Sequence, residues 1–87
     1  MAYKIILTET AIKEAKKHLG QKERDRLKKY LKGISENPRS QGDPMKGRFK
    51  GQWRYKIGKL RILCHIDDAK SELIVLRIRW RKDAYRK

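Results

Sequence analysis

The sequence has few residues that can form crosslinks or bind a metal, with one cysteine and two histidines among 87 residues. A single cysteine excludes an intramolecular disulfide, and this supply of ligands is too small for a zinc site with a full set of protein ligands. Cys64 lies in an apolar run and is expected to be a small buried residue in a reducing compartment. We therefore expect no metal and no cofactor.

Long apolar stretches are also absent. No run approaches the roughly 20 residues that a transmembrane helix requires, and the N-terminus lacks the basic and apolar regions of a signal peptide. We expect a cytoplasmic protein with no membrane partner. A chain of 87 residues is long enough for one domain, covering 1–87.

Acidic residues are scarce, with 10 Asp and Glu against 25 Lys and Arg, which gives a formal net charge of +15. Self-repulsion at this charge destabilises the compact state, so the charge indicates a polyanion partner or an acidic protein partner. The imbalance is greatest over 44–66, where no acidic residue occurs. The cations of this segment are Lys46, Arg48, Lys50, Arg54, Lys56, Lys59 and Arg61.

Hydrophobic periodicity divides the chain into a strand, two helices and three further strands. Residues 2–8 are typical of a strand, Thr8 is a suitable N-cap for a first helix, and Gly20 is a suitable end for it. Apolar residues recur at helical spacing over 21–35, and Pro and Gly within 36–44 interrupt regular structure. Further strands are expected at 53–57, 60–66 and 72–81, with a short helical tail after them.

This order, β-α-α-β-β-β, predicts a single-domain α+β fold. Three consecutive strands with short links form an antiparallel meander, and two helices that are separated by two or three residues form an antiparallel hairpin. The helix hairpin is expected to cover one face of an antiparallel sheet.

Alternation along the strands predicts which residues share a face. In the last strand it assigns Ile74, Leu76, Ile78 and Trp80 to the apolar face. The opposite face of the sheet is expected to collect Arg54, Lys56, Arg61, Arg77, Arg79 and Arg81.

Two interpretations of these cations stay open, a merely solvated surface or a binding site for a phosphate backbone. A solvated face normally mixes both signs of charge, so the lack of acidic residues favours phosphate binding. The helices do mix both signs, and their charged residues are expected to be solvated.

Two short motifs resemble those of the RelE/ParE superfamily of bacterial and archaeal toxins. One is a Tyr-x-hydrophobic-Gly-x-hydrophobic-Arg run from Tyr55 to Arg61, and the other is the terminal run 81–85, Arg-Lys-Asp-Ala-Tyr. The resemblance implies the toxin of a type II toxin-antitoxin system. In the RelE branch such toxins are ribosome-dependent endoribonucleases that cut messenger RNA in the ribosomal A site.

The resemblance also implies site residues and partners. Lys56, Arg61, Arg81 and Tyr85 match the catalytic set of the RelE branch. Trp80 departs from the family pattern, because many relatives have His or Lys at that position. The implied partners are messenger RNA, the ribosome and an acidic RelB-like antitoxin. The expected RNA-binding residues are Arg54, Arg77, Arg79, Lys46, Arg48 and Lys50.

The chemistry of these residue types is compatible with metal-independent attack of a 2′-hydroxyl. Lys56 is the candidate base, because repulsion from neighbouring cations disfavours its charged form. Arg61 is suited to clamp the phosphate oxygens, Arg81 to stabilise the leaving oxygen, and Tyr85 to orient a base. Two other functions stay open: a ParE-like toxin that inhibits DNA gyrase, and a non-enzymatic RNA-binding or ribosome-associated protein.

Overall fold

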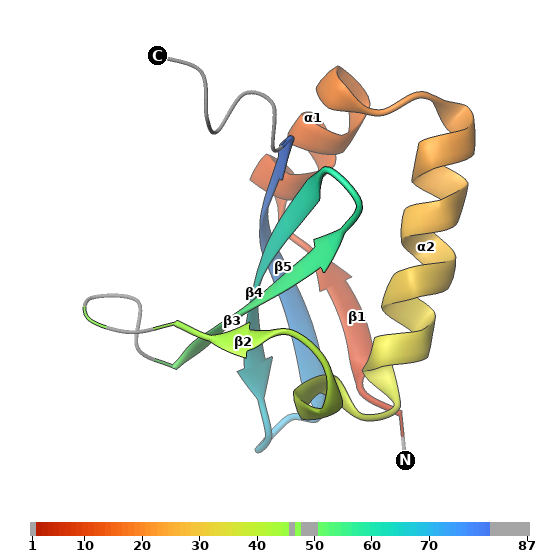
Figure 1. The fold of residues 1–87 in the computed structure, drawn as a ribbon. Coiled ribbons are helices and arrows are strands. Elements are labelled where there is room, and N and C mark those ends of the chain that lie inside the picture. Colours follow the sequence, from red (N-terminus) through yellow and green to blue (C-terminus); the bar gives the residue numbers. More distant parts are fainter. Residues whose placement is uncertain (1, 46, 48–50, 81–87) are drawn as a thin grey trace.

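Two helices and a five-stranded sheet form the part of the chain that the computed structural model describes, which is residues 2–45, 47 and 51–80, with only the backbone of Trp80 (Figure 1). The sheet order is β1-β5-β4-β3-β2. The elements in chain order are β1 (Lys4–Leu7), α1 (Glu9–His18), α2 (Gln21–Ser35), the 3-10 helix η1 (Pro38–Ser40), β2 (Asp43–Pro44), β3 (Gln52–Ile57), β4 (Leu60–Asp67) and β5 (Glu72–Trp80).

The expected meander is confirmed, because β3, β4 and β5 pair antiparallel in chain order. The prediction of an entirely antiparallel sheet is wrong, since β1 pairs parallel with the first half of β5. Thr8 sets this geometry at the end of β1. Its hydroxyl contacts the carbonyl oxygens of Val75 and Leu76 at 2.9 and 3.2 Å, and it accepts a hydrogen bond from Ala11 N as the N-cap of α1. The sheet is therefore mixed, with a parallel edge strand that leads directly into a helix.

The segment predicted to be only a turn also contains the short edge strand β2, in which Asp43 pairs with Arg54 and Pro44 with Trp53. A proline is tolerated there because an edge strand has one side without ladder hydrogen bonds. The predicted helical tail at the C-terminus lies outside the described residues.

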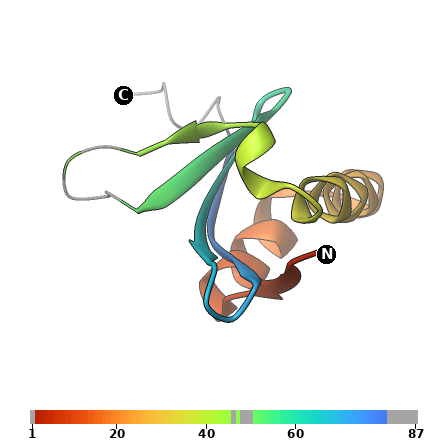
Figure 2. The ribbon, with the colours of Figure 1, turned by 90° about the horizontal axis from the view of Figure 1, so that it is seen from below.

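Both helices lie close to their predicted positions, and α2 covers the predicted residues 21–35. Leu19 is the C-cap of α1, and Gly20 is the N-cap of α2, where its amide donates to the Glu23 carboxylate at 2.7 Å. The two helices follow one another through this short link, as expected, and they diverge from it (Figure 1). Figure 2, a view from below, shows α2 along one side of the curved sheet and α1 behind the sheet.

The core lies between the two helices and one face of the sheet. Tyr55, Ile62 and Ile78 are adjacent across β3, β4 and β5, and each side chain is fully buried. The Tyr55 hydroxyl donates to the Pro38 carbonyl oxygen at 2.7 Å, which satisfies its one polar group. Cys64 is buried as expected, and burial raises the pKa of its thiol to about 12.

The alternation predicted for the last strand is only half right. The register shifts between Leu63 and Cys64, so that Leu76 is an extra residue in β5. This β-bulge moves the pattern by one position, as expected when two residues oppose one. The buried residues of β5 are therefore Leu73, Val75 and Ile78, whereas Ile74 and Leu76 are only partly buried.

Gly42 allows a close approach between the loop before β2 and strand β3. Its φ of 76° is left-handed, and a Cβ there would meet the Arg54 carbonyl oxygen and lie 2.8 Å from Trp53 Nε1. Gly58, with φ of 56°, has the same handedness but open space around it. A side chain at either glycine would strain the backbone, but only a side chain at position 42 would also overlap with β3.

We predict that Gly42→Ala lowers the free energy of unfolding by about 2 kcal/mol more than Gly58→Ala, because only the first substitution also forces β3 to move. Urea denaturation of the two variants measures the difference. Equal losses of stability would contradict the close approach at Gly42.

Candidate nucleic-acid interface

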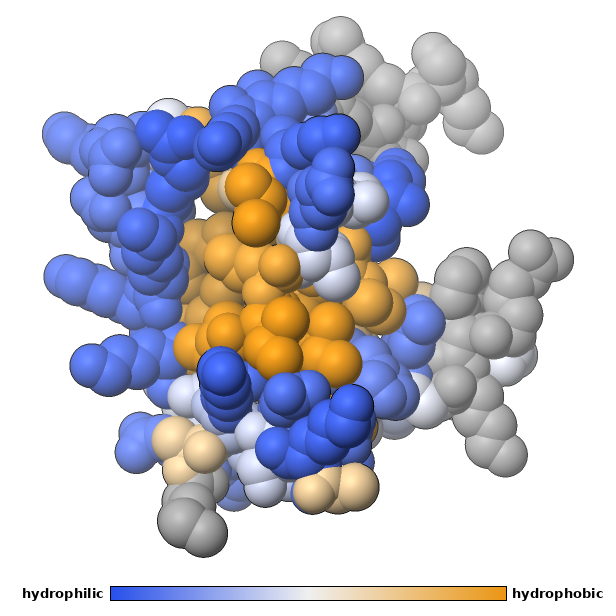
Figure 3. Space-filling view, turned by 180° about the vertical axis from the view of Figure 1, so that it is seen from behind, coloured by the Kyte–Doolittle hydropathy of each residue, from blue (hydrophilic) through white to orange (hydrophobic). Residues whose placement is uncertain are grey.

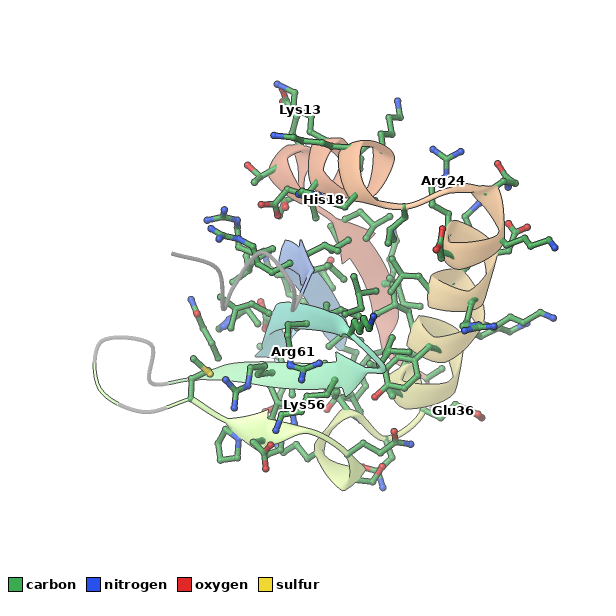
Figure 4. The ribbon with its side chains drawn as sticks, turned by 45° about the horizontal axis from the view of Figure 1, so that its top comes forward. Lys13, His18, Arg24, Glu36, Lys56 and Arg61 are labelled. Atoms are coloured by element: carbon green, nitrogen blue, oxygen red, sulfur yellow. The ribbon has the colours of Figure 1, made fainter. Side chains whose placement is uncertain are left out.

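Five cations lie on the face of the sheet opposite the buried row. Lys56, Arg61 and Arg79 are directly opposite one another across β3, β4 and β5, and Arg54 and Arg77 flank Leu63 in the next row. Side chains opposed in this way have Cβ atoms about 4.5–5.5 Å apart. We call Arg54, Lys56, Arg61, Arg77 and Arg79 the basic face; Figure 4 labels Lys56 and Arg61 on their neighbouring strands.

The members of the basic face differ in how they are held. Lys56 and Arg79 are exposed, whereas Arg61 is partly buried and donates from Nη1 to the carbonyl oxygens of Gly58 and Leu60 at 2.9 and 3.0 Å. Arg54 is partly buried, and its Nε has no hydrogen-bond partner among the described residues. Arg61 is thus fixed to the β3–β4 turn by one edge of its guanidinium.

Glu14 of α1 brings a carboxylate to the edge of the basic face, although charged residues of the helices were predicted to be solvated. Arg77 donates from Nε and Nη2 to both of its oxygens at 2.9–3.2 Å, and Arg79 Nε lies 3.5 Å from Oε2. The backbone amide of Ile78 donates to Oε1 at 2.8 Å. Burial opposes ionisation of Glu14, but the hydrogen bonds from Arg77 and Ile78 outweigh it and lower its pKa.

A signal for Glu14 was present in the sequence. Glu14 follows the buried Ala11 by three residues and precedes Ala15, and residues three apart on a helix share a face. Ala11 is small and lets this helix face approach its neighbour closely, so an acid three residues later on the same face is turned toward that neighbour.

The structure brings together Arg54, Lys56, Arg61, Arg77 and Arg79, of which Arg77 is engaged by Glu14. The roles assigned to these residues stay predictions. The remaining predicted site residues lie outside the described residues: Lys46, Arg48, Lys50, Arg81 and Tyr85.

A second surface is an apolar groove of about 330 Å³ where α1 and α2 diverge. Leu7 and Ile12 are about 40% exposed there, which is unusual for large apolar side chains. Figure 3 shows the apolar area on this side, surrounded by hydrophilic residues. The groove is lined by Leu7, Ile12, Ala15, Leu27, Leu31 and Ile78, with Lys16, Gln21, Arg24 and Lys28 beside them.

Neither a metal site nor a membrane span is found in the described part of the chain. No three His, Cys, Asp or Glu side chains gather there in a way that could hold a metal ion. The described helices are too short or too polar to cross a bilayer.

Comparison with known proteins relates this fold to toxins. A family model described as "ParE toxin of type II toxin-antitoxin system, parDE" matches residues 5–85. A search of curated proteins found no significant match.

Solved structures with the same fold include a chain of the RelBE2 toxin-antitoxin complex from Mycobacterium tuberculosis. It is 24% identical with a TM-score of 0.86, over 93% of this chain and 100% of that chain. The isolated RelE toxin of E. coli is 27% identical with a TM-score of 0.76, over 91% of this chain and 84% of that chain. A YoeB/ParE toxin from Agrobacterium tumefaciens is 16% identical with a TM-score of 0.72, over 88% and 96%.

Proposed function

Because the chain belongs to the ParE-toxin family of type II toxin-antitoxin systems, we propose that it is a RelE-like endoribonuclease that cleaves messenger RNA in the ribosomal A site, in the cytoplasm. The observation that carries the proposal is the row formed by Lys56, Arg61 and Arg79. Like charges opposed across strands destabilise a sheet, and the binding of phosphate would neutralise a row of three.

The cleavage step is attack of a 2′-oxygen on the adjacent phosphorus. The 2′-O–P bond forms and the P–O5′ bond breaks, which leaves a cyclic phosphate and a 5′-hydroxyl. Lys56 accepts the 2′-hydroxyl proton, and Arg61 binds the charged phosphate oxygens. Because Nη1 of Arg61 is taken up by two carbonyl oxygens, phosphate would be bound by its remaining nitrogens.

The remaining roles belong to residues beyond β5. Arg81 stabilises the leaving 5′-oxygen and supplies its proton through water, and Tyr85 stacks on a base to orient the nucleotide. Arg54 and the loop cations Lys46, Arg48 and Lys50 contact the flanking backbone, as does Arg79.

Two comparisons favour a second candidate function, inhibition of DNA gyrase. The matching family model is named for ParE, and one similar structure is that of a YoeB/ParE toxin. A gyrase-binding poison has no use for a base and a phosphate clamp on adjacent strands, whereas Lys56 and Arg61 are directly paired. Ribonuclease activity therefore accounts for more of the site.

An antitoxin is the expected protein partner, since one similar chain was solved in a toxin-antitoxin complex. The basic face and the apolar groove offer two surfaces to it. Apolar anchors in the groove would supply most of the binding energy, because desolvated charge pairs contribute little net affinity. Its acidic residues would accelerate association with a chain of charge +15.

The first prediction concerns cleavage. In a translating extract with mapping of messenger RNA ends, wild-type protein should produce cuts within codons at the A site. Arg61→Ala and Arg81→Ala should each reduce cleavage by about a hundredfold, the usual effect of removing one stabilising donor. Tyr85→Ala, which removes the stacking ring, should also reduce cleavage. Lys29→Ala, on the exposed side of α2, removes a charge away from the basic face and should cleave normally.

Circular dichroism checks that each variant is folded. Full toxicity of the Arg61→Ala, Arg81→Ala double variant would exclude the nuclease assignment. Growth arrest with intact messenger RNA and inhibited DNA supercoiling would instead establish the gyrase alternative.

The second prediction concerns free RNA. The proposed site has no histidine pair and needs the ribosome to hold the 2′-hydroxyl in line, so naked RNA should be cut about a hundredfold more slowly or worse. Single-turnover cleavage of one transcript, free and on stalled ribosomes, measures the ratio. Equal rates would show a self-sufficient site.

The third prediction concerns the antitoxin. Ile12→Asp places a carboxylate in the apolar groove and should weaken binding of the cognate antitoxin by about 2 kcal/mol or more, mainly through faster dissociation. Thr10→Asp adds the same charge at an exposed position of α1 and is the control. Neither change should alter toxicity.

Stopped-flow fluorescence at low and high salt measures both rates. The association rate should fall steeply with salt for wild type and for both variants. An association rate that is indifferent to ionic strength would rule out electrostatic attraction, and equal dissociation rates for the two variants would rule out the groove.

A further inference from the structure

Glu14 is the only carboxylate within ion-pair distance of the basic face among the described residues. It takes up two donor nitrogens of Arg77 and lies 3.5 Å from Nε of Arg79. Arg54, Lys56 and Arg61 form no ion pair in the described part of the chain. The five cations thus divide into two that share a carboxylate and three that do not.

We infer that Glu14 is a positioning residue that withholds Arg77 from phosphate and thereby limits the sequence-independent binding of nucleic acid by the basic face. The inference rests on the proposed function only in that this face binds phosphate. Strong non-specific binding would hold a +15 protein on any RNA, so withholding Arg77 favours the specific site over other RNA.

The hydrogen-bond geometry shows how Glu14 holds Arg77. Its guanidinium uses Nε and Nη2 together on one carboxylate, and such paired hydrogen bonds are the strong form of this interaction. Glu14 is itself held, because its Oε1 also accepts the Ile78 amide at 2.8 Å. The side chain of Glu14 is 15% exposed, so water screens the pair less than it screens a surface ion pair.

Glu14 also has a structural role that must be separated from this one. Strand β1 ends at Leu7, which pairs with Val75, so the Ile78 amide lies beyond the edge strand and Glu14 satisfies it. Glutamine keeps an oxygen that can accept this hydrogen bond but removes the charge that holds the arginines. Glu14→Gln therefore separates the two roles.

The experiment measures how binding of a fluorescent single-stranded oligouridylate depends on KCl concentration. The logarithm of the association constant falls linearly with the logarithm of salt, by about 0.7 for each phosphate contact on a single strand. Glu14→Gln frees Arg77, so its slope should be steeper than that of wild type by about 0.7.

Glu9→Gln is the matched control. Glu9 lies on the same helix, is exposed, and pairs with Lys13 one turn away, so its removal changes the net charge equally without affecting the basic face. Its slope should equal that of wild type. Equal slopes for Glu14→Gln and Glu9→Gln would overturn the inference, because a merely structural role changes stability and not the number of phosphate contacts.

Two variants that retain Glu14 test the inference even if Glu14→Gln fails to fold. Lys56→Gln removes a cation that has no carboxylate partner and should reduce the slope by about 0.7, whereas Arg77→Gln should leave it unchanged. If both variants reduce the slope equally, Arg77 already contacts phosphate and the inference fails. These slopes do not depend on cleavage, so failure of the nuclease assignment would appear separately, as intact messenger RNA on ribosomes.

Discussion

The pairing of Lys56, Arg61 and Arg79 across three strands is the constraint on which the rest of the structure depends. Like charges directly opposed on a sheet are destabilising. The adjacent row on the other face, Tyr55, Ile62 and Ile78, offsets this cost, since full burial of one large apolar side chain contributes about 1.5–3 kcal/mol. Packing against α2 therefore stabilises a charged surface that the strands alone would not maintain.

The β-bulge at Leu76 allows both faces to exist on one strand. Upstream of it, Leu73 and Val75 point into the core, and without a bulge the same alternation would turn Arg77 and Arg79 inward and Ile78 outward. One extra residue corrects the phase, so that Ile78 enters the core and both arginines join Arg61. A bulge beside a candidate site is a common means of redirecting side chains.

Local rules were sufficient to predict α2, the meander and most of the basic face, because each depends on periodicity within one segment. Periodicity could not predict the parallel pairing of β1 with β5. This pairing depends on where the chain rejoins the sheet after the two helices. Periodicity also missed the bulge, since Ile74 and Leu76 are as apolar as the buried residues of β5. Glu14 was interpreted as solvated because its partner Arg77 is 63 residues away in the sequence.

Helix α1 connects the two candidate surfaces. Ile12, Ala15 and Lys16 line the apolar groove, while Glu14 from the same turn holds Arg77 and Arg79 at the edge of the basic face. A partner that packs in the groove therefore contacts the helix whose position fixes these arginines. Because the Ile78 amide and both arginines share one carboxylate, the position of α1 is tied both to the edge of the sheet and to the cations of the face.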